Sequence, residues 1–164
     1  MKKLLFVLAL AVIPMAVFAD FRIGATAMYK GTPQALVSVV PNDVGAFAFG
    51  AEARLGISIL EGQAMALYNF NRSFDTYLDV GIALDIAILT IGVGVGPNIA
   101  VNLIPSAPEA ASFGFNGKAH VDLNLGKFTI SGYYMIILDR LDMTNIQDNL
   151  TLGNVGLSVL LKLF

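Results

Sequence analysis

The sequence of 164 residues contains no cysteine and only one histidine, and charged residues make up 13% of it. Without cysteine the chain has no disulfide framework, no thiol chemistry and no thiolate metal site. A hydrophobic content of 56% is high for a soluble domain. The charges nevertheless interrupt the apolar segments too often for a bundle of transmembrane helices. Ten basic residues against 12 acidic ones give no sign of a nucleic-acid-binding surface.

The first 19 residues form a segment of their own, MKKLLFVLALAVIPMAVFA. Two lysines precede an apolar run that ends in the small-x-small triplet Val-Phe-Ala, which is the pattern of a secretory signal peptide. The apolar run is shorter than the ~20 residues that a membrane-spanning helix needs. We therefore expect residues 1–19 to be a signal peptide that is removed before Asp20, and residues 20–164 to form the mature domain.

Two long segments in the middle of the chain alternate with a period of two. Nearly all even positions from 74 to 88 are apolar, and all odd positions from 91 to 103 are apolar. Such alternation predicts two β-strands with one apolar face each, joined by a tight turn at 89–90. Pro97 cannot donate a hydrogen bond to a neighbouring strand, so we expect a bulge or a frayed strand end there.

The same alternation recurs along the whole mature chain. Eight strands are predicted, at residues 21–29, 44–59, 63–70, 74–88, 91–103, 113–125, 128–138 and 154–163. The connections alternate between tight turns, at 61–62, 89–90 and 126–127, and mostly longer loops, at 30–43, 71–73, 104–112 and 139–151. An even strand number with alternating short and long connections is typical of outer-membrane barrels. The sequence thus predicts an all-β fold, an eight-stranded antiparallel up-and-down transmembrane β-barrel.

Aromatic residues on the apolar faces fall near the predicted strand ends, as they do at the two interfaces of a membrane-spanning barrel. Near the ends joined by the longer loops lie Tyr29, Phe47, Phe49, Tyr68, Phe70, Phe74, Phe113 and Phe115. Near the ends joined by the tight turns lie Phe21, Phe128 and Phe164. Because short turns face the periplasm in such barrels, we expect the longer loops outside the cell.

With its signal sequence, its eight alternating strands and its final Phe164, the chain resembles the small eight-stranded outer-membrane barrels of bacteria. This group includes outer membrane protein X, outer membrane protein W and the transmembrane domain of outer membrane protein A. The resemblance implies a chain that is exported by its signal peptide and surrounded by the lipid of the bacterial outer membrane. It also implies insertion by the barrel-assembly machinery, with Phe164 as the assembly signal.

Charged residues lie mainly on the strand face opposite the apolar one, which in a barrel is the face of the lumen. They are Arg22, Glu52, Arg54, Asp75, Asp79, Asp85, Lys118, His120 and Asp122. An unpaired charge in a narrow lumen is costly to desolvate. We therefore expect these acidic side chains to pair with Arg22, Arg54 and Lys118 in one polar network.

The same residues allow two weaker interpretations. His120 and Asp122 could form a base and its orienting carboxylate, but no nucleophile accompanies them. The three aspartates between residues 75 and 85 share a face and could hold a cation, although charge pairing explains them as well. The Gly-Val-Gly-Val-Gly segment at 92–96 lacks the spacing of a dinucleotide-binding loop. We therefore predict no catalytic, cofactor-binding or metal site, and we do not expect an enzyme.

Two functions fit a barrel. In the first, it has a structural or surface-interaction role, with a side-chain-filled lumen and with the loops at 30–43 and 139–151 meeting an extracellular partner. In the second, it is a narrow channel for small or apolar solutes, which the inward-facing Met28, Met65 and Leu67 would favour.

A third interpretation, from a different class, is a helical protein of the inner membrane. It rests on residues 86–108, which carry no charge and are long enough to span a bilayer. Glycines and prolines within that segment disfavour a helix, so we rank this interpretation last.

Overall fold

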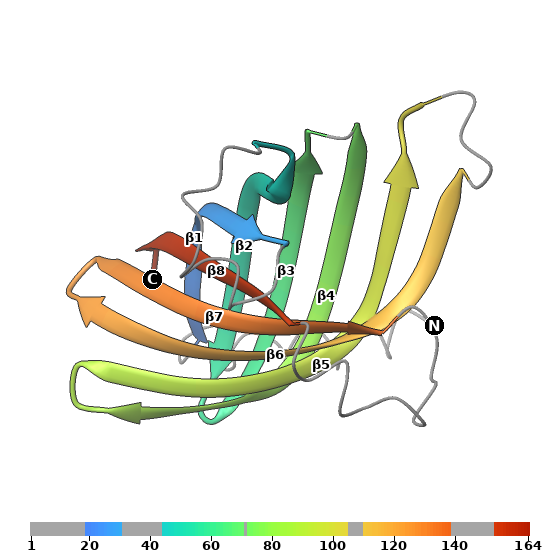
Figure 1. The fold of residues 1–164 in the computed structure, drawn as a ribbon. Coiled ribbons are helices and arrows are strands. Elements are labelled where there is room, and N and C mark those ends of the chain that lie inside the picture. Colours follow the sequence, from blue (N-terminus) through green and yellow to red (C-terminus); the bar gives the residue numbers. More distant parts are fainter. Residues whose placement is uncertain (1–18, 31–43, 71, 105–109, 139–152) are drawn as a thin grey trace, which may run out of the picture.

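A computed structural model of the chain describes residues 19–30, 44–70, 72–104, 110–138 and 153–164. Eight strands form a closed antiparallel barrel in which each strand pairs with the next and the last with the first (Figure 1). They are β1 (Ala19–Tyr29), β2 (Phe47–Ile57), β3 (Leu60–Asn69), β4 (Ser73–Ile86), β5 (Leu89–Asn102), β6 (Ala111–Leu125), β7 (Phe128–Leu138) and β8 (Asn154–Lys162). The predicted all-β, up-and-down barrel of eight antiparallel strands is confirmed.

The barrel has two different ends. At the turn end, two-residue turns join β2 to β3, β4 to β5 and β6 to β7. The opposite end, where β1 finishes and β2 begins, is termed the loop end. Residues 31–43 and 139–151, predicted to meet a partner, lie outside the described residues, as do residues 1–18 of the predicted signal peptide.

Two of the three tight turns are displaced from their predicted positions. The turn between β2 and β3 lies at Ser58-Ile59 instead of 61–62, and the turn between β4 and β5 lies at Ala87-Ile88 instead of 89–90. Each contains a residue of positive φ, 57° at Ser58 and 56° at Ala87, although neither residue is a glycine. The turn at 61–62 was predicted wrongly because the prediction followed the Glu-Gly dipeptide, which instead lies within β3.

The displaced turns leave the predicted strand faces unchanged. In both the predicted and the observed hairpins, the numbers of two paired residues add to an odd number, so odd residues of one strand share a face with even residues of the next. The third turn, Gly126-Lys127, is confirmed, with Leu125 paired to Phe128. The apolar faces therefore point outward as expected.

The second strand is shorter than predicted at its first end. Val44–Ala46 form a 3-10 turn, η1, and β2 begins only at Phe47. The backbone N–H of Lys30 donates to the carbonyl oxygen of Ala46 at 2.8 Å, just beyond the last pair of β1 with β2, Tyr29 with Phe47. Backbone contact between the two segments therefore continues one residue beyond the last strand pair.

Pro97 neither forms a bulge nor ends β5, contrary to the prediction. It pairs with Phe115 of β6 on one side, and β5 continues past it. On the other side, pairing with β4 lapses opposite Leu78 and Asp79 and resumes at Val80 in the same register. Because the register is unchanged, no extra residue is inserted, and the missing N–H of proline interrupts the ladder only locally.

The helical interpretation of residues 86–108 is wrong. Leu89–Asn102, the centre of that segment, forms β5. None of the helices in the described parts of the chain is long and apolar enough to cross a membrane.

Gly50 of β2 allows a close approach to the backbone of β3. A Cβ atom at this position would lie 1.8 Å from the carbonyl oxygen of Ala66. The same holds at the seam between β1 and β8, where a Cβ on Gly24 would lie 1.9 Å from the carbonyl oxygen of Val159. Any larger residue at these positions must displace a neighbouring strand.

We expect Gly50→Ala to lower the free energy of unfolding by ~1–3 kcal/mol, the usual cost of overpacking. Gly132→Ala is the matched control, because Gly132 is exposed and no atom lies within 4 Å of an added Cβ. The control should be neutral or slightly stabilising. Denaturant unfolding followed by circular dichroism measures both, and equal stability of the two variants would contradict the close approach.

Candidate functional site: the barrel lumen

The side chains that face the lumen form two layers. The half next to the turn end holds most of the charged residues, and the half next to the loop end holds a cluster of apolar residues together with the ion pair of Asp75 and Lys30. An eight-stranded barrel is just wide enough for its interior to be filled in this way. Because it collects buried charges from distant parts of the chain, the lumen is the candidate site.

Glu52 is the hub of the charged layer. Its Oε1 accepts hydrogen bonds from Nε of Arg54 at 2.7 Å and from the ammonium group of Lys118, while its Oε2 accepts one from the hydroxyl of Ser158. Glu52 and Arg54 are each 1% exposed, and Lys118 is 3% exposed. Charges buried to this degree depend on one another, since none of them retains a water shell.

Asp122 joins two arginines in the same layer. Nη1 of Arg54 donates to both of its oxygens, at 3.0 and 2.9 Å, and Nη1 of Arg22 donates to one of them at 3.2 Å. Closer to the turn end, Arg22 also pairs with Asp20, whose carboxylate lies 3.2 Å from Nζ of Lys162. These ion pairs connect β1, β2, β6 and β8 across the lumen.

His120 lies among carboxylates but lacks the geometry of a catalytic pair. Its Nε2 is 3.4 Å from Oε1 of Glu61 and 3.9 Å from Oδ2 of Asp122, and it has no hydrogen-bond partner among the described residues. The distance to Asp122 is too long for a hydrogen bond. Its Nδ1 lies 3.3 Å from Nε2 of Gln63, and the residue is 2% exposed. The geometry gives no support to a base held by a carboxylate.

Asp75 and Asp79 of β4 have separate partners. Asp75 forms an ion pair with Lys30 near the loop end, and not with Lys118 or the arginines that were expected. Asp79 accepts a hydrogen bond from Nδ2 of Asn116. The expectation of one network shared by all the inward charges is therefore too simple, because the two aspartates lie at different heights along the strand.

Asp85 lies apart from the charged layer. Its side chain is exposed and accepts a hydrogen bond from the hydroxyl of Thr90. The displaced turn explains this, since it places Asp85 beside Ile86, the last residue of β4, where the lumen opens. Within the described ranges, no group of three or more His, Asp or Glu side chains could hold a metal ion.

The glycines of β5 explain how β6 side chains reach across the lumen. Three of them pair directly with long polar residues of β6: Gly92 with His120, Gly94 with Lys118 and Gly96 with Asn116. Since β5 carries no side chain at these points, the three polar residues reach partners on the strands beyond, namely Gln63 of β3, Glu52 of β2 and Asp79 of β4. A Cβ on Gly92 would lie 2.2 Å from the His120 ring. The glycine segment thus makes room for the polar layer.

The apolar layer closes the other half of the lumen. One cluster of buried side chains forms it, made of Met28, Ala48, Met65, Leu67, Tyr77, Tyr133 and Met135. Met28, Leu67 and Met135 have no exposed surface. Buried side chains thus occupy both halves of the lumen, mostly paired charges next to the turn end and mostly hydrocarbon next to the loop end.

Sequence comparison finds no matching family model and no matching curated protein. A functional proposal for this chain therefore rests on the geometry of the barrel. The resemblance to the small outer-membrane barrels stays a prediction.

Glu61 belongs to the lumen, although the sequence analysis placed it in a turn. Its side chain is 6% exposed and accepts a hydrogen bond from Nε2 of Gln63. If the alternation of β3 is continued from Gln63 by two residues toward the turn, Glu61 is predicted to face the lumen. The turn signal of the following glycine outweighed that alternation in the prediction.

Hydroxyl groups complete the network and were also not predicted. Nη2 of Arg54 donates to Oγ of Ser131 at 2.7 Å, Oγ of Ser158 and Oγ1 of Thr26 are 2.8 Å apart, and the hydroxyls of Thr26 and Tyr133 are 3.0 Å apart. All four hydroxyl residues are buried. Their inward positions follow from strand alternation, but their partners lie on other strands and follow only from the fold.

Proposed function

We propose that this chain is an integral β-barrel of the bacterial outer membrane, with a largely side-chain-filled lumen and a structural or surface-interaction role. In this role the predicted loops at 30–43 and 139–151 meet an extracellular partner, while outer-membrane lipid surrounds the wall. Residues 1–19 act as the signal peptide. The observation that carries the proposal is the burial of a charged and an apolar layer inside one closed barrel.

The outer surface of the barrel supports a location in lipid. Large apolar side chains are exposed on the wall, among them Val80, Val95 and Phe113 at 70%, 69% and 72%. Monomeric soluble proteins rarely expose a large continuous apolar surface, whereas a membrane-spanning barrel requires one. The wall is therefore better suited to hydrocarbon than to water.

A cluster of aromatic rings near the loop end supports the same location. Neighbouring ring centroids are 5.3 to 6.1 Å apart in the series Tyr29, Phe47, Phe49, Phe70 and Tyr68. Such rings are enriched where a membrane meets water. The cluster thus marks one proposed interface of the bilayer.

Phe164 lies against β1 at the turn end. Its ring stacks on that of Phe21 with centroids 5.6 Å apart, and its carbonyl oxygen accepts a hydrogen bond from the N–H of Phe21 at 3.0 Å. The residue is 63% exposed and follows the end of β8 at Lys162. An exposed ring beside the closing seam is compatible with the proposed role of Phe164 as the signal for the barrel-assembly machinery.

We expect the purified protein to show little or no steady conductance in planar lipid bilayers. An ion would have to cross both the paired charges and the apolar cluster, whose described side chains are almost fully buried. A porin of known conductance, added afterwards to the same bilayer, controls for detection. Large and stable current steps from this protein would contradict the closed lumen.

A narrow channel for small or apolar solutes is the second candidate. The apolar layer favours it, because Met28, Met65 and Met135 have flexible side chains that repack readily around an apolar molecule. The charged layer beneath would also have to move aside. Uptake of a small apolar solute into vesicles that depends on this protein would make the channel the preferred function.

A further inference from the structure

We infer that a groove on the outer wall of the barrel binds one acyl chain of a membrane phospholipid. The inference rests on the proposed function, since it requires the wall to face lipid. The groove lies over β1 to β5 and has a volume of about 440 Å³. Ligand pockets in proteins usually measure ~300–1,000 Å³. We term this depression the wall groove.

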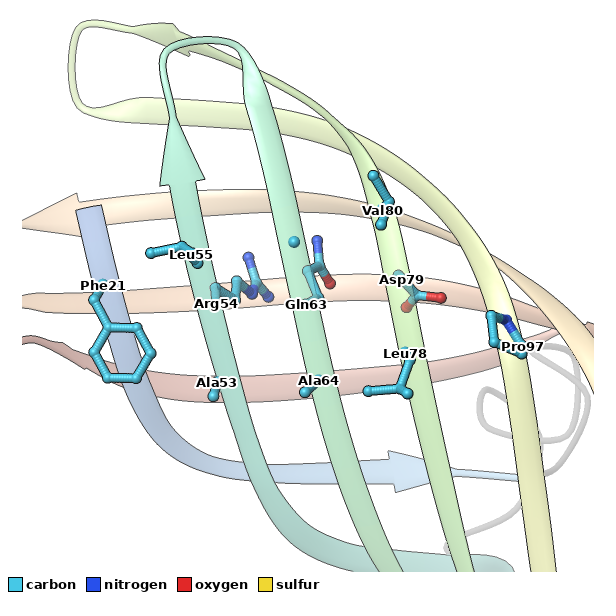
Figure 2. A pocket seen from close by; sticks show the side chains of 11 residues that line it. Phe21, Ala53, Arg54, Leu55, Gln63, Ala64, Leu78, Asp79, Val80 and Pro97 are labelled. Atoms are coloured by element: carbon cyan, nitrogen blue, oxygen red, sulfur yellow. The ribbon is translucent and has the colours of Figure 1, made fainter. Parts of the chain in front are cut away.

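The wall groove has a floor of small residues between taller sides (Figure 2). The floor consists of Ala53, Gly62 and Ala64, and the paired Ala53 and Ala64 lie at its centre. Phe21 and Leu55 stand on one side, and Leu78, Val80 and Pro97 stand on the other. The depression therefore arises because side chains of two central strands are shorter than their neighbours.

Only apolar side chains face the wall groove. Three polar residues also contribute to its lining, Arg54, Gln63 and Asp79. Their side chains are buried, and each has a hydrogen-bond partner inside the lumen. The groove thus offers no charged or hydrogen-bonding group to a headgroup or to a polar ligand, and it selects hydrocarbon.

The groove is elongated along the strands. A second depression of about 200 Å³ shares its floor and continues to the paired Ala51 and Ala66, and Thr76 of β4 adds one hydroxyl to its otherwise apolar outer lining. The next pair, Phe49 with Tyr68, closes it toward the loop end. From Leu55 to Ala51 the strand rises ~13 Å, at ~3.3 Å per residue. This elongated shape suits a linear hydrocarbon chain better than a compact solute.

The height of the groove on the barrel indicates which lipid supplies the acyl chain. The groove begins near the turn end, since Leu55 lies close to Ile57 at the end of β2, and it finishes below the aromatic cluster. Aromatic rings mark the membrane interface, so the groove lies at the depth of hydrocarbon. Short turns face the periplasm in outer-membrane barrels, so the groove lies in the periplasmic leaflet of the proposed membrane. In that leaflet a phospholipid supplies the acyl chain.

A second copy of this chain fits the groove less well. A two-fold contact places the same patch of both copies face to face. A concave groove would then meet a concave groove and leave a cavity, whose lining loses its packing contacts. A flexible acyl chain fills the depression without any matching protein surface.

Filling the groove with a ring tests the inference. The protein is reconstituted into vesicles of phosphatidylethanolamine and phosphatidylglycerol, extracted in mild detergent and weighed by native mass spectrometry. We expect a phospholipid adduct on the unmodified protein and its loss in Ala64→Phe. The adduct should persist in Ala119→Phe, which places the same ring on the exposed outer face of β6, outside the groove. An adduct retained in Ala64→Phe, or absent from the unmodified protein, would overturn the inference.

Photo-crosslinking of the unmodified protein gives a test that needs no variant. The same vesicles contain a phospholipid with a diazirine in its acyl chain, and we expect labelling to concentrate on peptides of β2 and β3. Uniform labelling of the wall in a membrane-inserted protein would overturn the inference that the wall groove binds an acyl chain, but not the proposed function. Failure of the protein to insert into the membrane would overturn the proposed function. Because the sequence has no cysteine, Ala64→Cys provides a unique thiol. Efficient disulfide-linked dimers would show that a second copy occupies the groove and would also overturn the inference.

Discussion

Replacing Arg54 with methionine is expected to lower the free energy of unfolding by ~3–5 kcal/mol, the usual cost of breaking a buried ion pair from one side. The guanidinium group is 1% exposed and donates hydrogen bonds to Glu52, Asp122 and Ser131. Methionine preserves much of the length of the side chain but leaves two carboxylates short of a cation in the closed lumen. Because the chain has no tryptophan, circular dichroism during urea unfolding in detergent is the suitable measurement.

Lys162→Met is the matched control for this change. The side chain of Lys162 is 45% exposed and pairs with Asp20 at 3.2 Å. An exposed ion pair contributes ~0–1 kcal/mol, so this variant should unfold nearly as the unmodified protein does. If Arg54→Met were no less stable than Lys162→Met, the charged layer would not hold the barrel together.

Replacing Val95 with arginine is expected to cost ~2–4 kcal/mol in a lipid bilayer, because the side chain lies near the middle of the proposed hydrocarbon layer. Val95 is 69% exposed on the outer face of β5, close to the midpoint of the strand. No internal packing is lost by this change, so the cost arises only from contact with lipid. Refolding yield and unfolding in phospholipid vesicles measure it.

Val101→Arg serves as the comparison on the same strand and face. Val101 lies beside Asn102, the last residue of β5, where the proposed membrane interface allows arginine at a cost of ~0–1 kcal/mol. Both changes introduce the same charge on an outward-facing valine. Equal losses, or no loss in either variant, would mean that the wall of the barrel does not lie in hydrocarbon.

Strand faces could be predicted from the sequence more securely than strand registers. The turn at 126–127 was placed correctly, whereas the turns at 61–62 and 89–90 were displaced by three and two residues toward the N-terminus. Hairpin turns depend on local φ angles, and Ser58 and Ala87 adopt positive values that their residue types do not signal. The predicted strand faces are nevertheless correct, because they depend only on whether the residue numbers of two paired residues add to an odd or an even sum.

The candidate site was predicted as a set of inward-facing residues whose acidic members pair with Arg22, Arg54 and Lys118, and only part of that pairing is observed. Glu52, Arg54, Lys118 and Asp122 meet in the lumen, whereas Asp75 and Asp79 have other partners and Asp85 is exposed. Glu61 entered the lumen because β3 begins earlier than expected. Inward direction follows from alternation along one strand, but the height at which two side chains meet follows from the register of every strand between them.

By itself, the sequence determined the number of strands, their faces and their antiparallel order, since a period of two is a local property that many registers preserve. Only the tertiary structure decided which charges meet, because Arg54 and Asp122 are separated by 68 positions and come together through the closure and shear of the barrel. It also decided that the glycines of β5 lie opposite the long polar side chains of β6, so that these side chains can cross the lumen. The wall groove has the same origin, since its floor and sides come from five strands whose relative heights are set only when the barrel closes.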